Sequence, residues 1–165
     1  MPLDATDAII ALTDAAPGDH PALLVRQCAQ LTGAAAVAAA LADDAGGLRC
    51  AAAVPLSAGS LLRLDLSRGG PAARCFGTGR AVRAAALGRW PDVAAAARRL
   101  GLTAVDAVPV RGCDGAVGVL CLYGTTPLRT ADRDLVQALA DVAGLAMSAT
   151  RAVATAVVLG RATLN

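Results

Sequence analysis

The sequence predicts an α+β domain in which helices cover an antiparallel sheet. Two pairs of apolar segments, within residues 34–55 and 104–124, are each joined by a turn rich in Asp and Gly, which is typical of β-hairpins. Segments with helical periodicity and helix-end residues lie before, between and after these pairs. Because hairpin strands pair antiparallel, we expect one such sheet with helices on its faces rather than a doubly wound parallel sheet.

Two helices are expected before the first strand. Residues 4–12 have a weak helical pattern, and a second helix follows Asp19 as a candidate N-cap, contains Pro21 in its first turn and ends at Gly33. The next segment, AAAVAAALA, would be helical by propensity alone, since alanine is the best helix former. It leads through DDAGG into LRCAAAVP, however, so we interpret both apolar runs as the strands of a hairpin.

The middle of the chain, residues 56–87, is the least regular part. Pro71 can begin a short helix that runs to about Phe76 before the glycines of FGTG, and residues 81–85 can form an edge strand. The stretch RWPDVAAAARRLG then predicts a helix with Pro91 in its first turn.

The second hairpin places an aspartate inside an apolar strand. With the hairpin tip at Cys113 and Asp114, side-chain alternation predicts one face that contains Ala104, Asp106, Val108, Val119, Cys121 and Tyr123. Burying an unpaired carboxylate costs several kcal/mol. Asp106 therefore needs either an ion pair or a polar ligand in an open pocket, while a register shift of one residue would invert the faces. The arginines considered for the ion pair are Arg74, Arg80, Arg89 and Arg98.

A long last helix is expected from Thr130, as its cap, to about Leu159. Its apolar residues recur at alternating steps of three and four: Leu135, Leu139, Val142, Ala146, Ala149, Val153 and Ala156. Because a sheet covers only about 10–14 residues of a helix, the part beyond Thr150 should project with its valines exposed. A symmetric helix bundle in a homodimer would bury them, and a helix that ends early is the alternative.

Composition argues against several classes of protein. The formal charge of +2 is too small to indicate a nucleic-acid surface. The N-terminus lacks the basic region of a secretory signal, and charges interrupt every apolar stretch before about 20 residues, so we expect a cytoplasmic protein without a membrane span. The five cysteines are widely spaced and His20 is the only histidine, so no disulfide framework, metal site or catalytic Cys-His or Ser-His pair is expected.

Three stretches together resemble a GAF domain: RCFGTGRAV, RWPDVAAAARRLGLTAVDAVPVRGCDGAVGVLCLYG and LRTADRDLVQALADVAGLA. More narrowly, residues 22–149 are similar to the GAF half of actinobacterial transcription antitermination regulators, which couple GAF to an RNA-binding ANTAR module. The terminal RATLN resembles the junction to that module, which is not in this chain. The resemblance implies a sheet of five or six strands with the first and last helices on one face. It also implies a small-molecule cavity on the other face, roofed by short helices.

These observations predict a non-enzymatic sensor domain over residues 1–150, with a helical extension over 151–165 toward the ANTAR-type output module. It would be a homodimer through its terminal helices, bind a small molecule without a cofactor or metal, and make no direct contact with nucleic acid or membrane. The candidate ligand-binding residues, with Asp106 as anchor and the aromatic residues as walls, are Cys75, Phe76, Trp90, Asp92, Asp106, Cys121 and Tyr123. The alternatives are a dimerisation scaffold without ligand and a cysteine-based redox sensor, in which Cys113 is the most plausible reactive thiol.

Overall fold

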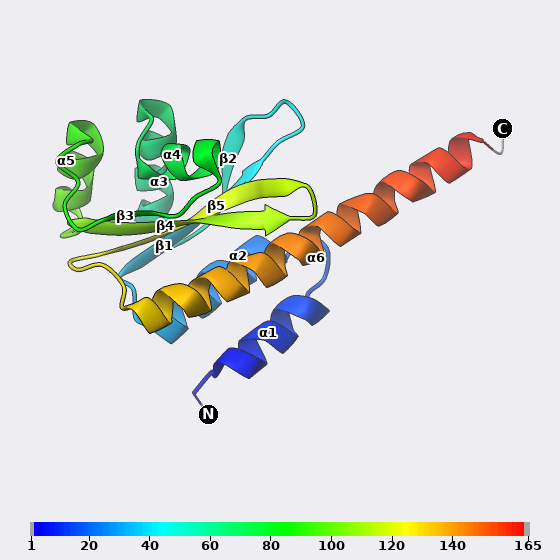
Figure 1. Ribbon diagram of the computed structural model, residues 1–165, viewed down its shortest axis with the longest axis horizontal. Coiled ribbons are helices and arrows are strands. Elements are labelled where there is room, and N and C mark those ends of the chain that lie inside the picture. Colours follow the sequence, from blue (N-terminus) through cyan, green and yellow to red (C-terminus); the bar gives the residue numbers. More distant parts are fainter. Residues whose placement is uncertain (1, 164–165) are drawn as a thin grey trace.

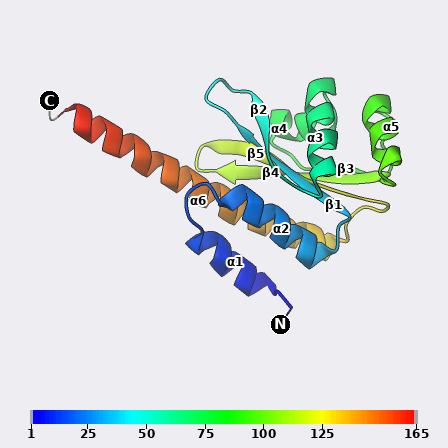
Figure 2. The same ribbon diagram turned by 180° about the vertical axis from the view of Figure 1, so that it is seen from behind.

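A five-stranded antiparallel sheet separates two layers of helices in the computed structural model, which describes residues 2–163 (Figures 1 and 2). The strand order is β2-β1-β5-β4-β3, so β2 and β3 are the edges. The strands are β1 (Ala36–Ala42), β2 (Leu48–Val54), β3 (Val82–Ala84), β4 (Ala104–Gly112) and β5 (Gly115–Gly124). The helices are α1 (Ala5–Asp14), α2 (His20–Thr32), α3 (Leu56–Arg68), α4 (Pro71–Thr78), α5 (Pro91–Arg99) and α6 (Thr130–Ala162). The predicted α+β class is confirmed.

The helices divide between the two faces of the sheet as expected. α1, α2 and α6 pack on one face, here called the α6 face, and α3, α4 and α5 pack on the other, the α4 face (Figure 1). The strands present Val37, Ala39, Val108, Leu120 and Leu122 to the α6 face. They present Ala38, Ala107, Val119, Cys121 and Tyr123 to the α4 face.

The alanine-rich segment is strand β1, as the hairpin pattern predicts. It pairs with β2 on one side and with β5 on the other, and its residues 36–40 are buried between the two helix layers. One contact between β1 and β5 requires a glycine, because a Cβ at Gly118 would meet the backbone oxygen of Ala40. Tertiary burial therefore overrides the helical propensity of alanine here.

The segment that looked irregular begins with helix α3, which the sequence interpretation missed. Its buried residues recur at helical spacing, at Ala58, Leu61, Leu62 and Asp65. Of the two predicted caps, one has the expected position and the other is wrong. Asp19 occupies the N-cap position of α2 but makes no side-chain cap bond, and Thr130 is the first residue of α6 rather than its cap.

The predicted register of the second hairpin is wrong by one residue over most of its length. The tip is as expected, with Gly115 at φ 125°. A bulge follows, because Arg111 pairs with Ala116 whereas Val110 pairs with Gly118. Asp106 consequently pairs with Leu122 rather than Cys121 and lies on the α6 face.

Helix α6 has a packed half and a projecting half (Figure 2). Its buried residues, all before residue 145, contact the sheet and α1 and α2. Every described residue from 151 to 163 is exposed, which confirms the predicted projection. The most apolar 18 residues of α6 have a mean hydropathy of 1.7, so the helix is long and apolar enough to cross a membrane, a property that core helices of soluble proteins can share.

Candidate functional site

The seven predicted ligand-binding residues do not form one site. Cys75, Cys121 and Tyr123 lie together in the core on the α4 face, and Phe76 and Trp90 are half-buried against that core. The first three side chains are at most 1% exposed, so no water-sized void reaches them. The cavity expected above this part of the sheet is therefore closed.

The two predicted carboxylates lie elsewhere. Asp92 is exposed at the start of α5, where its Oδ2 is 3.5 Å from Nε of Arg68. Asp106 is 3% exposed on the opposite face of the sheet. Its expected position beside Cys121 and Tyr123 is wrong because the bulge at Val110 and Arg111 shifts the register.

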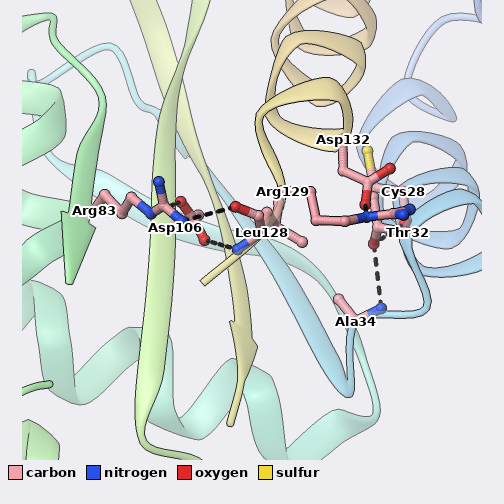
Figure 3. A network of polar contacts seen from close by, with 8 residues as sticks. All are labelled: Cys28, Thr32, Ala34, Arg83, Asp106, Leu128, Arg129 and Asp132. Atoms are coloured by element: carbon pink, nitrogen blue, oxygen red, sulfur yellow. Dashed lines mark hydrogen bonds and ion pairs between the residues drawn. The ribbon is translucent and has the colours of Figure 1, made fainter. Parts of the chain in front are cut away.

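Asp106 holds the connection between β5 and α6 (Figure 3). The backbone N–H of Leu128 donates to Asp106 Oδ2 at 2.7 Å. Arg83, on β3, donates from Nη2 to the carbonyl oxygen of Leu128 at 3.0 Å, and its Nε is 3.9 Å from Asp106 Oδ1. The carboxylate thus has the arginine partner that its burial requires, although this arginine was not among those considered. We call Arg83, Asp106 and Leu128 the Asp106 clamp.

A second buried carboxylate, Asp65 on α3, was not predicted. Its side chain is fully buried and accepts hydrogen bonds from the backbone N–H groups of Ala72 (3.0 Å) and Ala73 (3.2 Å) in the first turn of α4. Burial raises the pKa of Asp65 from 3.8 to about 6, against the lowering effect of these two hydrogen bonds. A lone acid within the apolar stretch LLRLDLS was the available signal.

The other polar groups on the α4 face are a phenol and two thiols. The Tyr123 hydroxyl has no hydrogen-bond partner among the described residues, and burial raises its pKa well above the usual range. Burial also raises the pKa of Cys75 to about 12 and that of Cys121 well above its ordinary value. Both thiols stay protonated at neutral pH, which makes them poor nucleophiles for redox chemistry. Cys113 at the hairpin tip is the exposed cysteine.

An open hollow of about 600 Å³ lies beside edge strand β3. It lies between the end of α4, β3 and the connection from β3 to α5, and Trp90 forms part of its wall. Its volume is in the range of small-molecule sites, about 300–1,000 Å³. The lining contains no acidic residue and four arginines: Arg74, Arg80, Arg83 and Arg89. We call this the arginine hollow.

The sequence carried a signal for the arginine hollow that the prediction did not use. Residues 66–91 contain five arginines and no acidic residue. Within the described part of the chain, Arg74, Arg80 and Arg89 make no ion pair. The site that the geometry offers is therefore an open, cationic surface hollow beside the predicted core cavity.

Comparisons with known proteins agree with this fold. A GAF domain from an Acinetobacter phosphoenolpyruvate-protein phosphotransferase superposes with a TM-score of 0.69 at 16% identity, covering 90% of this chain and 93% of that one. A GAF domain/HD domain protein from Geobacter sulfurreducens has a TM-score of 0.65 at 18% identity, with coverage of 87% and 97%. Residues 122 to 287 of a methyl-accepting chemotaxis protein have a TM-score of 0.65 at 20% identity, with coverage of 85% and 94%.

No curated protein matches this sequence. The sequence profile of the GAF domain family matches residues 22–148. GAF domains are typically regulatory sensor domains of signalling proteins, such as the methyl-accepting chemotaxis protein to which this chain is similar. With its profile match, its antiparallel sheet and its two helix layers, this chain belongs to the GAF domain family.

Proposed function

We propose that this chain is a non-enzymatic sensor domain that binds a small molecule and passes the change through α6 to an attached output module. One observation carries the proposal: α6 starts beside the Asp106 clamp and continues as a single helix far beyond the sheet. The sequence resemblance suggests an RNA-binding ANTAR module in transcription antitermination as the output. RNA contact would then belong to that module.

The projecting half of α6 supports a homodimer. Its exposed apolar side chains are Val153, Val157, Val158 and Leu159, of which Val153 is 65% exposed. A helix half that is exposed along its whole length is marginally stable on its own, and exposed apolar stripes mark interaction surfaces. A second copy presents the same stripe, so two α6 helices related by a two-fold axis would cover each other.

We favour this pairing over membrane insertion of α6. Arg151 lies within the most apolar part of the helix, and its Nη2 is 3.1 Å from Asp44 Oδ1. A charged side chain at the centre of a bilayer costs about 2.5–3.5 kcal/mol on insertion scales. The first half of the helix is also committed to the sheet. We therefore propose a cytoplasmic dimer.

Sedimentation velocity at micromolar concentration tests the homodimer on which the proposed relay depends. We expect a dimer for the chain and a folded monomer for the V153E/V157E variant, because two carboxylates per helix would be buried in the shared stripe. The T155E/A162E variant adds the same charge to the opposite side of the same helix half and should remain dimeric. A monomeric wild-type chain, or equal dissociation by both variants, would contradict the pairing.

A further inference from the structure

We propose that the arginine hollow binds a small polyanion with phosphoryl groups, and that its occupancy alters the Asp106 clamp at the start of α6. The binding step stands on the hollow alone. The second step rests on the proposed sensor function.

The charge distribution of the hollow indicates an anionic ligand. Arg74, Arg80 and Arg89 come from α4, from the residues before β3 and from the connection before α5, and they line one hollow of about 600 Å³. None has an acidic partner among the described residues, and the lining holds no carboxylate. Guanidinium groups bind phosphate oxygens through paired, charge-assisted hydrogen bonds. Three such groups from separate segments fit a ligand with more than one anionic group.

Trp90 adds an apolar wall to this cationic site. Its side chain is half-buried, and its backbone N–H donates to the carbonyl oxygen of Leu87 at 2.9 Å, which fixes the turn that carries it. A flat ring beside guanidinium groups can stack on an aromatic part of a ligand. It is also the only tryptophan in the chain, so its fluorescence reports events in the hollow.

Arg83 connects the hollow to α6. As part of β3 it lines the hollow, while its side chain lies on the α6 face and contacts Leu128 and Asp106 (Figure 3). β3 is three residues long and pairs only with β4, so it is the least constrained strand of the sheet. A shift of β3 around a bound anion would move Arg83 and loosen its hold on Leu128, two residues before α6 begins.

The binding step is tested by Trp90 fluorescence with two probes, pyrophosphate and adenosine diphosphate. We expect a saturable change with the wild-type chain and at least tenfold weaker binding by R80Q/R89Q. The control R98Q/R99Q removes the same charge from exposed arginines of α5 that do not line the hollow, and should change affinity less than twofold. Tighter binding of the nucleotide than of pyrophosphate would assign a role to ring stacking, and equal binding would assign recognition to the phosphates; both support the site. No saturation by either probe up to millimolar concentration, or equal weakening by both variants, would overturn it.

Hydrogen exchange of residues 125–135 tests the second step. Saturating pyrophosphate should speed exchange around Leu128 at least twofold in the wild-type chain. In R83Q, pyrophosphate at a concentration that saturates the Trp90 fluorescence change of this variant should leave exchange unchanged, and R83K replaces this variant if R83Q unfolds. Binding without any change in exchange in the wild-type chain would overturn the coupling. This outcome is distinct from failure of the proposed homodimer, which sedimentation detects without any anion.

Discussion

Two helices of this domain, α4 and α6, start beside a buried aspartate, and the two aspartates differ in how their charge is balanced. Asp106 lies near Arg83 and accepts one backbone N–H, from Leu128. Asp65 accepts backbone N–H groups from Ala72 and Ala73 and makes no ion pair within the described residues. Burial alone therefore does not fix how the charge of a carboxylate is balanced. At Asp65, where the backbone N–H groups are the partners, burial outweighs their lowering effect and raises the pKa of the carboxyl group to about 6.

Among the proposed substitutions, replacing either buried aspartate by alanine should lower the free energy of unfolding most. Asp65→Ala leaves two N–H groups of α4 without an acceptor, and we expect a loss of about 3 kcal/mol in the free energy of unfolding. Asp106→Ala leaves one N–H and a half-exposed arginine unpaired, and should cost about 2 kcal/mol. Denaturant unfolding at pH 7 measures both values. A larger loss of stability for Asp106→Ala than for Asp65→Ala would contradict this order.

The second largest effect is expected in the pH dependence of stability, to which Asp65 should contribute. Because the pKa of Asp65 rises to about 6 on folding, the folded state holds a proton between pH 4 and 6 that the unfolded state has released. Stability should therefore fall as pH rises through this window, by about 2–3 kcal/mol at about 1.4 kcal/mol per pKa unit. Asp65→Asn should lack this component when unfolding curves are compared from pH 4 to 7. Identical curves for the two proteins would contradict the assignment.

A glycine beside Asp65 offers a smaller test. A Cβ at Gly70 would lie 2.7 Å from the carboxylate carbon of Asp65, so Gly70→Ala should push the carboxylate from its donors and cost about 1–2 kcal/mol. Gly77, also at α4, has open space at its Cβ position. Gly77→Ala should be neutral or stabilise the chain by up to about 1 kcal/mol. Thermal unfolding distinguishes the two, and equal effects would place Asp65 elsewhere.

The smallest effect is expected at the arginine of the Asp106 clamp. The Arg83 side chain is 44% exposed, so solvent screens its interaction with Asp106. Arg83→Gln should lower the free energy of unfolding by less than about 1 kcal/mol. If denaturant unfolding gives a loss as large as that of Asp106→Ala, the guanidinium rather than the Leu128 hydrogen bond holds the connection.

The sequence predicted the strands better than it predicted which face each residue occupies. β1 was recognised despite its alanines because hairpin context outweighs intrinsic propensity. The bulge in β5 had no signal, since Ala116, Val117 and Gly118 are all small or apolar and would fit either register. This single extra residue moved Asp106 to the other face and away from the other candidate site residues.

Only part of the candidate site could be predicted from the sequence. Trp90 was expected in a ligand wall and lines the arginine hollow, but the hollow itself depends on how α4, β3 and the following connection fold against one another. Its arginines were considered only as ion-pair partners. Asp65 was missed because α3 contains Gly59 and three serines, which weaken its helical pattern.

Because α6 is one continuous helix, a small change in its direction is amplified along its length. At 1.5 Å per residue, its 33 residues extend about 50 Å. A tilt of about 5° at its origin would carry its far end about 4 Å sideways, nearly one helical turn. An event too small to alter the fold near the sheet could thus shift whatever follows the helix by the width of a side chain.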